Sequence, residues 1–464
     1  MSREKQSMTG GAFSTVHDVP DEFASIGAAV DAAAIGDTVR IAPGLWTENL
    51  GLGEKGLLLT GTAPGNPAIV AQTVIDGSAE VAPTVWIGGS GTLPVRLRGL
   101  TVQGGAGALV STPHWRRIGG GVYCESGELT IDHCRIADNR FGSGSAAGGG
   151  IFVGEAGALT VRASSLVDNR ANEGGGLAVE GGSAVLRLVR IANNSADEGG
   201  GIRISAGGEL DAEDCVFEAN GPDQFDYPWL RGGAVFCGSG GEIRLIRCDL
   251  FDNHADNGGA VASQGYFEMR GGTIARNRAN SGGGGLLILS SGAADLEDVV
   301  IARNWALWRG AAINNDGGGL RLGRSTVVMN GGGDVIAQSG NAWAEISNSM
   351  LWSNASGGVT MGNDLWAWSS DATQLSYCLG PEDLVGESNV LGPPYFITWR
   401  GNEFVLSPGR WGDSDAALPR SPAIDAGPPR LSDWLDWPKG YDNGRRSDIG
   451  IHGGPGGVLW QKKE

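Results

Sequence analysis

One eleven-residue phrase, which returns nine times between residues 129 and 354, constrains the fold more than any other feature of the chain. Every copy ends in Asn, and a Gly run with a short apolar segment, such as GGGIFV (148–153), separates the copies. The copies are LTIDHCRIADN (129–139), LTVRASSLVDN (159–169), AVLRLVRIANN (184–194), LDAEDCVFEAN (210–220), IRLIRCDLFDN (243–253), FEMRGGTIARN (267–277), ADLEDVVIARN (294–304), LRLGRSTVVMN (320–330) and AEISNSMLWSN (344–354). The steps between successive terminal Asn residues are 30, 25, 26, 33, 24, 27, 26 and 24 residues. A period of this length, carried by short strands, predicts a β-solenoid.

The apolar positions inside the phrase predict three strands per turn. Residues ten and eight before the Asn are apolar, as in Leu129 and Ile131, and this alternation indicates a strand with one buried face. A break in phase before the apolar residue at minus three, such as Ile136, indicates a second strand, and the Gly-led segment supplies the third. We therefore expect an all-β chain that forms a single parallel β-helix. Coils about 4.8 Å apart would give a rod of roughly 50–60 Å.

The recurring Asn is explained by structure rather than by chemistry. A buried turn leaves backbone groups without partners, which is costly. An inward Asn can bond its own turn and stack its amide on the Asn residues of the neighbouring coils. The small residue two positions later, as in Ala171 and Ala196, suits the same corner, and the Gly runs allow positive φ and close approach of coils.

The two ends of the chain differ from the repeat. Residues 1–20 are expected to be a disordered leader or tag. Residues 21–35, DEFASIGAAVDAAAI, predict a short amphipathic helix that caps a β-helix spanning 21–370. From 371 to 464 the repeat fades and Pro rises, which indicates irregular final coils and a C-terminal cap.

Charge and hydropathy exclude several partners. The chain has 34 Lys and Arg against 52 Asp and Glu, a net charge of −18, so nucleic acid and anionic lipid are poor partners. No apolar run is long enough to span a membrane. The N-terminus lacks the apolar core of a secretory signal, so either the chain is cytoplasmic or its export signal is missing from this sequence. The six Cys residues form no CxxC pair, which argues against a zinc ribbon.

These motifs resemble a known family. The Gly-led strands and Asn-ended turns resemble the right-handed β-helix proteins of the pectin-lyase-like superfamily and the repeats of chlamydial polymorphic outer-membrane proteins. NSMLWSN (348–354), LSYCLG (375–380), NEFVLSPG (402–409), SPAIDAG (421–427) and DNGRRSDIGIHGG (442–454) resemble, in order, the tail of the choice-of-anchor Q family. An insertion at 410–420 and the ending IHGG depart from that family's pattern. The resemblance implies a right-handed parallel β-helix. Members of this family are usually exported bacterial proteins, which implies a secreted or cell-surface location. The resemblance implies no reaction.

The turn just after the Asn is a candidate cation site. Glu173 and the pair Asp197 and Glu198 fall on adjacent coils, while Asp138 and Asp168 precede the Asn nearby. Hard oxygen ligands gathered at one corner could hold Ca²⁺, which is the one cofactor that the sequence suggests. The alternative is a solvated acidic ridge. A polysaccharide lyase of this fold would also need an Arg or Lys base beside such a cluster, and no such base stands out.

The same edge further along is a candidate ligand site. The insertion 221–231 supplies Phe225, Tyr227 and Trp229, the next coil supplies His254, and NWALWR supplies Trp305, Trp308 and Arg309. Aromatic faces stack on sugars, and charged groups bond hydroxyls. The alternative is that these aromatic side chains fold over the rod as a lid.

Two further patterns are expected to be structural. The residues nine before the Asn alternate mostly in sign up the rod and predict outward ion pairs; they are Asp211, Arg244, Glu268, Asp295, Arg321 and Glu345. Cys215 and Cys248 occupy the same inward position on adjacent coils, so a disulfide and two buried thiols are both open.

We therefore expect a non-enzymatic rod. Its loop edge is expected to bind a partner, which is either a carbohydrate (glycan) or a protein surface. The alternatives are a carbohydrate-active enzyme, a lyase or hydrolase acting on acidic polysaccharide, and a structural spacer. The sequence leaves the oligomeric state open.

Overall fold

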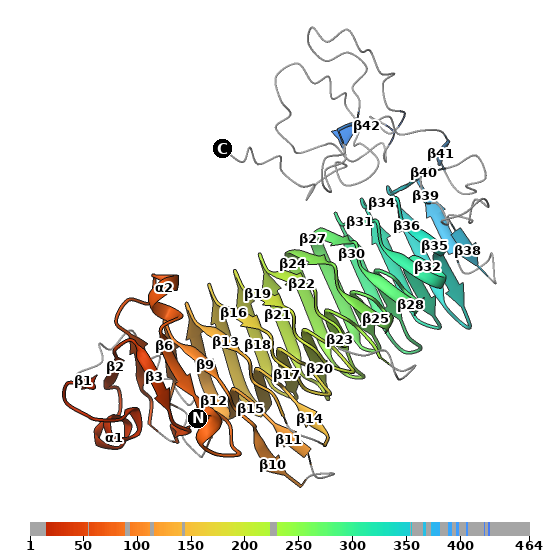
Figure 1. The fold of residues 1–464 in the computed structure, drawn as a ribbon. Coiled ribbons are helices and arrows are strands. Elements are labelled where there is room, and N and C mark those ends of the chain that lie inside the picture. The colour runs from red at the N-terminus through yellow and green to blue at the C-terminus, as the bar shows by residue number, and fades with distance from the viewer. Residues whose placement is uncertain are drawn as a thin grey trace, which may run out of the picture.

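The computed structural model describes residues 15–53, 55–88, 93–111, 116–141, 144–222, 230–352, 354, 365–367, 373–380, 388–391, 396–398, 405–406, 422 and 426. Within these residues the chain is a right-handed parallel β-helix of about 13 turns, as the sequence predicts. Figure 1 shows the coils stacked into one rod. Residues 1–14 of the expected leader (1–20) and most of the expected C-terminal cap lie outside the described residues. Val16–Val19, within the expected leader, form strand β1, which pairs with β2 (Thr38–Ile41) at the start of the rod.

Three parallel ladders run the length of the rod. Ladder I contains β4 (Leu50–Gly51), β7 (Val85–Ile87), the first part of β12 (Val122–Asp132) and of β15 (Ile151–Arg162), β17 (Leu177–Glu180), β20 (Ile202–Ser205), β23 (Val235–Cys237), β26 (Val261–Ser263), β29 (Leu286–Ile288), the last part of β32 (Trp305–Asp316) and of β35 (Gly331–Ser339), and β38 (Leu365–Ala367).

Ladder II begins with the first strand of the chain. It contains β1 (Val16–Val19), β2 (Thr38–Ile41), β5 (Leu58–Gly61), β8 (Val95–Arg98), the last part of β12 and β15, β18 (Ser183–Arg187), β21 (Glu209–Glu213), the first part of β24 (Glu242–Phe251) and of β27 (Tyr266–Ala275), β30 (Ala293–Glu297), β33 (Gly319–Gly323), β36 (Trp343–Ser347) and β39 (Thr373–Ser376).

Ladder III ends at the Asn corner. It contains β3 (Gly44–Thr47), β6 (Thr73–Asp76), β9 (Thr101–Gln103), β13 (Arg135–Ala137), β16 (Ser165–Val167), β19 (Arg190–Ala192), β22 (Val216–Glu218), the last part of β24 and β27, β31 (Val300–Ala302), β34 (Thr326–Val328), β37 (Met350–Trp352), β40 (Leu379–Gly380) and β41 (Val390–Leu391).

A shorter set of pairings follows the Asn corner. It contains β25 (His254–Asn257), β28 (Arg278–Gly282) and the first parts of β32 and β35. A separate small sheet joins β10 (Ala108–Val110), β11 (Arg116–Ile118) and β14 (Ala146–Ala147), and β42 (Phe396–Thr398) pairs with β43 (Val405–Leu406). The remaining short elements are α2 (Pro67–Val70) and the 3₁₀ turn η1 (Gly77–Ala79).

The Asn residues form the hydrogen-bonded ladder that the sequence predicts. The side chain of Asn220 donates from Nδ2 to Asn253 Oδ1 at 3.0 Å and to Ile191 O at 2.9 Å, and its backbone N–H donates to the same Asn253 Oδ1. The pattern repeats from Asn139 to Asn354, and these Asn side chains are buried. The residue before each Asn from Asn139 to Asn330 turns the chain through positive φ, as at Asp252 and Arg276. The Asn residues therefore support the corner from within.

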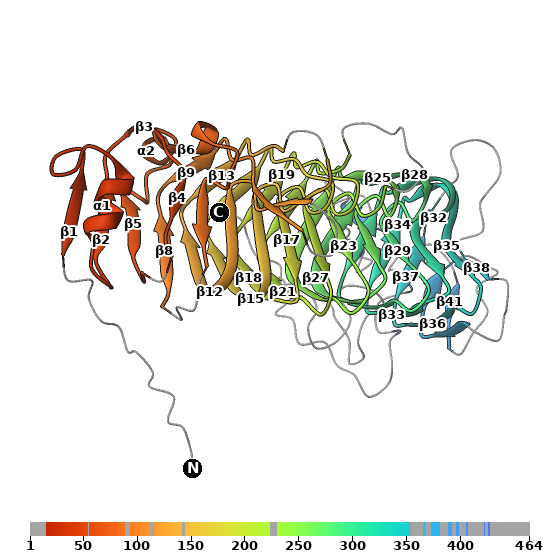
Figure 2. The ribbon, with the colours of Figure 1, turned by 90° about the horizontal axis from the view of Figure 1, so that it is seen from below.

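The helix α1 (Ile26–Ala32) covers the N-terminal end of the rod, within the range that the sequence predicts (Figure 2). Ser25 caps it by accepting a hydrogen bond from Ala28 N, and Ile26 and Val30 join the main core. The helix shields backbone groups and apolar side chains of the first coil from water. None of the helices in the described residues is long and apolar enough to cross a membrane.

Candidate functional site

The corner that follows the Asn ladder carries a group of arginines beside aromatic rings, which we call the arginine corner: Arg276, Arg278, Arg303 and Arg309, with Phe251, Trp305 and Trp308. The pairing of β25, β28 and β32 places His254, Arg278 and Trp305 in one column on successive coils. Because neighbouring strands lie about 4.8 Å apart, the three side chains leave the rod side by side.

Two arginines of the corner stack on aromatic rings. The guanidinium carbon of Arg278 lies 4.7 Å from the ring centroid of Trp305, and that of Arg276 lies 4.9 Å from Phe251. Arg276 also donates from Nε and Nη2 to the two oxygens of Asp252, at 2.9 and 2.8 Å. That hydrogen bond raises the pKa of Arg276. Stacking and ion pairing therefore hold the planes of these guanidinium groups in fixed orientations.

The positive charge of the corner is only partly balanced. Arg276 and Arg303 occupy the same position on neighbouring coils, each directly before an Asn of the ladder, so two like charges leave the backbone about 4.8 Å apart. Within the part of the chain that the structure describes, Arg276 has a carboxylate partner, whereas Arg278 and Arg303 have none. In a chain of net charge −18, this corner is suited to an anionic group.

The corner also exposes apolar surface. The side chain of Trp308 is 72% exposed and that of Leu307 is 56% exposed, although both belong to strand β32. A tryptophan held on a rigid strand and open to water offers a flat face for stacking. The nearby Asp334 is partly buried, and burial raises its pKa, while the charge of Arg309 opposes the rise.

The predicted ligand residues are brought together in part. His254, Trp305, Trp308 and Arg309 lie on the same corner within two coils, as the sequence predicts. His254 places Nε2 3.0 Å from Pro222 O. Phe225, Tyr227 and Trp229 lie outside the described residues, so their place in the site stays a prediction. The alternative that the sequence left open was that these aromatic side chains fold over the rod as a lid. With a 72% exposed side chain, Trp308 is not folded against the described residues in that way.

Sequence reasoning missed three members of the arginine corner. Arg276, Arg278 and Arg303 flank Asn residues that we interpreted as structural, in the segments IARNR (274–278) and IARNW (301–305). The signal was an Arg on both sides of one Asn and again before the next, at the point where the other coils carry Asp, Asn, Ala, Met or Ser. Those flanking positions leave the corner while the Asn between them points inward.

The predicted calcium corner is occupied by ion pairs. Glu173 and Glu198 are paired residues on adjacent coils, and both carboxylates contact Arg203 at 3.2 Å. Arg116, from β11, contacts Glu173 at 3.4 Å and binds both oxygens of Glu180. The guanidinium of Arg116 also lies 5.7 Å from the ring centroid of Phe152. Two arginines therefore hold three carboxylates in one half-buried cluster.

The other predicted calcium ligands lie elsewhere. Asp138 and Asp168 both approach Arg135, at 3.6 and 3.4 Å, and Asp197 accepts a hydrogen bond from Asn172 at 3.0 Å. Among the residues that the structure describes, no three His, Cys, Asp or Glu side chains gather in a way that could hold a metal ion. The Ca²⁺ site therefore stays a prediction, and the arginine contacts favour the acidic ridge over it.

Burial changes the acidity of the cluster around Glu173. Burial raises the pKa of Glu173, and the nearby charges of Arg203 and Arg116 only partly oppose that rise. Burial likewise raises the pKa of Tyr123, which lies on the same face, to about 12. A carboxyl whose charged form is disfavoured next to two other carboxylates is an arrangement found in acid–base sites.

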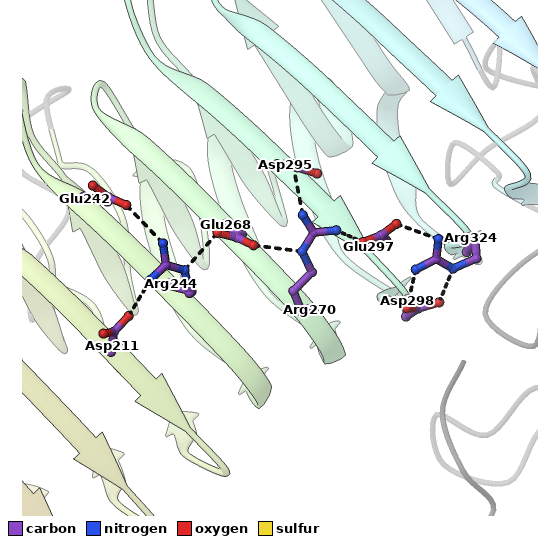
Figure 3. A network of polar contacts seen from close by, with 9 residues as sticks. All are labelled: Asp211, Glu242, Arg244, Glu268, Arg270, Asp295, Glu297, Asp298 and Arg324. Carbon is purple, nitrogen blue, oxygen red and sulfur yellow. Dashed lines mark hydrogen bonds and ion pairs between the residues drawn. The ribbon is translucent and has the colours of Figure 1, made fainter. Parts of the chain in front are cut away.

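The outer face of ladder II is saturated with ion pairs (Figure 3). Arg244 bonds Asp211 at 3.1 Å and Glu268 at 3.0 Å, and Arg321 contacts Glu345 at 3.5 Å, which confirms the predicted pairing up the rod. Glu268 and Asp295 have the same sign on adjacent coils. Arg270, from the next outward position, bridges them at 2.9 and 3.2 Å and also contacts Glu297. We interpret this face as stabilising.

Comparison with known proteins supports the fold. The family model described as "Right handed beta helix region" matches residues 98–274. This chain is a β-helix. Among solved structures, it is similar to the pectate lyase Pel9A, with 13% identity over 95% of this chain and 96% of the other and a TM-score of 0.42. It is also similar to the pectin methylesterase PemA from Erwinia chrysanthemi, with 10% identity over 78% and 95% and a TM-score of 0.32. Similarities of this size say nothing about activity, and no curated protein gives a significant match.

Proposed function

We propose that this β-helix is a non-enzymatic binding protein that holds an anionic polysaccharide along its arginine corner. The observation that carries the proposal is the pair Arg278 and Arg303, which lack a carboxylate partner among the described residues and belong to the same corner as exposed Trp308. Carboxylate or sulfate groups would supply the missing charge, and the tryptophan would stack on a sugar ring. Because Arg278 and Trp305 pair on neighbouring coils, a polymer aligned with the rod axis would contact side chains from more than one coil.

The experiment measures binding of the full chain to soluble polygalacturonate and alginate by isothermal titration calorimetry, with a neutral glucan of similar length beside them. Trp308→Ala and Arg303→Ala are each expected to weaken binding about tenfold, since stacking on one sugar or one charge-assisted hydrogen bond contributes roughly 1.4 kcal/mol. Trp343→Ala is the matched control, because Trp343 is 42% exposed but lies on ladder II, where Arg321 stacks on it at 5.4 Å.

Three outcomes would reject the proposal. The first is equal affinity of the parent protein for the neutral glucan. The second is an equal loss in Trp343→Ala and Trp308→Ala. The third is no binding to any glycan, which would favour a protein partner at the same corner or a structural spacer.

One observation favours a second candidate function, the hydrolysis of an acidic polysaccharide at the cluster around Glu173. Glu173 and Glu198 lie on adjacent coils, so their backbones are about 4.8 Å apart. Retaining glycosidases place two carboxyl groups at about 5 Å, one of them an acid of raised pKa. Burial raises the pKa of Glu173, and the two arginines could hold a uronate.

The test of this candidate is the release of reducing ends without unsaturated products from polyuronates, with and without Ca²⁺; unsaturated products would indicate elimination instead of hydrolysis. Activity that disappears in Glu173→Gln and persists in Arg303→Ala would support hydrolysis at the cluster and overturn the non-enzymatic proposal. If no product forms, the cluster is a set of ion pairs that joins β11 to ladder I and has a structural role.

The location is also a proposal, supported by the family resemblance. We propose that the native protein is secreted or lies on the bacterial cell surface. Antibody labelling of intact cells, compared with lysed cells, tests this: labelling that requires lysis would contradict it.

A further inference from the structure

Two of the six cysteines lie directly above one another in the rod. Glu213 pairs with Ile246 and Val216 pairs with Asp249, so the register makes Cys215 and Cys248 partners on adjacent coils. The backbone N–H of Asp249 donates to Cys215 O at 2.9 Å, which fixes this alignment. Adjacent coils lie about 4.8 Å apart, within the range of about 4.4–6.8 Å between the Cα atoms of disulfide-bonded cysteines.

The two thiols also point to the same place. Cys248 Sγ lies 3.6 Å from Ala212 O, which belongs to the coil of Cys215, as well as 3.5 Å from Ile246 O. Cys215 Sγ lies 3.2 Å from Glu213 O. Both side chains are buried, with exposed fractions of 1% and 0%, and both are free thiols in this structure. The sulfur of one coil therefore reaches the backbone that holds the sulfur of the other.

The other four cysteines have no such neighbour. The backbone N–H of Cys134 donates a hydrogen bond to Ser164 Oγ of the next coil, and Cys378 follows Ser349 in the same position. Cys124 pairs with Ile87 and Val153, and Cys237 pairs with Ile204 and Ser263. Any intramolecular disulfide between adjacent coils must therefore join Cys215 to Cys248.

We propose that Cys215 and Cys248 form a disulfide that joins two neighbouring coils when the chain meets an oxidising thiol–disulfide buffer. In glutathione buffer, one thiolate attacks oxidised glutathione and releases one glutathione thiolate. The second protein thiolate then attacks the mixed disulfide and releases the other. Two protein thiols are thus oxidised to one disulfide, and one oxidised glutathione is reduced to two glutathione molecules.

The position of the disulfide indicates that it would stabilise the fold. It closes a segment of 33 residues, and the step from Asn220 to Asn253 that it spans is the longest in the repeat. A cross-link is most stabilising where it removes the freedom of a long loop from the unfolded chain. The disulfide would hold together the two coils that precede the arginine corner, which begins at Phe251.

The electrostatic environments of the two thiols differ. The hydrogen bond from the thiol of Cys248 lowers the pKa of Cys215, and the same contact together with burial raises the pKa of Cys248. Burial raises the pKa of the isolated Cys124 and Cys237 thiols to about 11, which leaves them unreactive.

The test counts thiols in the full chain refolded with reduced and oxidised glutathione, trapped by alkylation and mapped by mass spectrometry without reductant. We expect four alkylated cysteines and one cross-linked peptide pair that contains Cys215 and Cys248. We also expect the midpoint of thermal unfolding to rise by about 3 °C over the reduced protein. Cys134→Ser, at the same inward position, is expected to keep both the cross-link and the rise.

Two results would overturn the inference: six alkylated cysteines under oxidising conditions, or a cross-link that includes any other cysteine. Because the parent protein itself gives the decisive peptide map, the test stands even if Cys215→Ser fails to fold. Where that variant folds, the rise in the unfolding midpoint on oxidation is expected to vanish.

Discussion

At the scale of single residues, the same side chain has different tasks at different positions of the coil. Arg244 and Arg270 lie on the outer face of ladder II, where carboxylates surround them (Figure 3). Arg278 and Arg303 flank the Asn ladder and have no carboxylate partner in the described part of the chain. The difference follows from position, because the strand face pairs neighbouring coils whereas the corner turns its side chains to water. Unpaired charge is therefore the property that marks the arginine corner.

The Asn ladder yields the first prediction. The side chain of Asn253 is fully buried and takes part in four hydrogen bonds, with Asn220, Asn277 and Phe217. Asn253→Ala would leave Phe217 O and the backbone N–H of Asn220 without partners, which we expect to lower the free energy of unfolding by about 3 kcal/mol. Urea unfolding measures this. Asn172→Ala, which removes a surface bond to Asp197, is the control, and an equal loss in both variants would contradict the structural role of the ladder.

A second prediction concerns pH. Burial raises the pKa of Asp334 above its ordinary value of 3.8. The protonated carboxyl therefore stabilises the fold below pH about 4, and that contribution is lost as the pH rises through the folded pKa. We expect Asp334→Asn to unfold at a higher temperature than the parent protein at pH 7.5 and at the same temperature near pH 3.5. A variant that is less stable at pH 7.5 would show that the attraction of Arg309 outweighs burial.

At the scale of elements, the Gly run sets how closely the coils approach. A Cβ added at Gly233 would lie 2.3 Å from Gly259 O and 2.5 Å from His254 O, both backbone atoms of the next coil. We expect Gly233→Ala to destabilise the fold by about 3 kcal/mol or more, because the backbone must shift. At Gly65 an added Cβ meets nothing within 4 Å, so Gly65→Ala is expected to change stability by less than about 0.5 kcal/mol in urea unfolding. Similar effects at both positions would contradict the close approach of coils.

The elements also show what the sequence could and could not predict. The three strands, the inward Asn and the shared position of Cys215 and Cys248 follow from periodicity, because each depends only on residues one coil apart. The cluster around Glu173 does not, since Arg116 reaches Glu180 from 64 residues away through the small sheet of β10, β11 and β14.

Two further contacts were missed for a related reason. The bridge of Arg270 between Glu268 and Asp295 joins two different outward positions of the repeat. The pair of like charges at Arg276 and Arg303 was hidden by the structural role of the Asn beside each of them. Comparing the coils one repeat position at a time finds contacts between residues at the same position of neighbouring coils. It does not find contacts between residues at different positions.

At the scale of the whole molecule, a rod of net charge −18 carries a basic corner. The overall charge repels a polyanion at a distance, and the corner attracts it at contact. Added salt screens both effects, because the screening length falls to about 10 Å at 0.1 M salt. Long-range repulsion and local attraction together predict that a polyuronate binds along the arginine corner only. We also expect its contacts with Arg278, Arg303 and their neighbours to weaken as the salt concentration rises.

The affinity of the full chain for polygalacturonate, measured by calorimetry at several salt concentrations in the parent protein and in Arg278→Ala with Arg303→Ala, tests the central claim most directly. We expect the parent protein to bind at low salt and to lose affinity steadily as salt rises. The double variant should bind at least tenfold more weakly, with a shallower dependence on salt. Equal affinity and equal salt dependence in the two proteins would contradict the assignment of the arginine corner as a polyanion-binding surface.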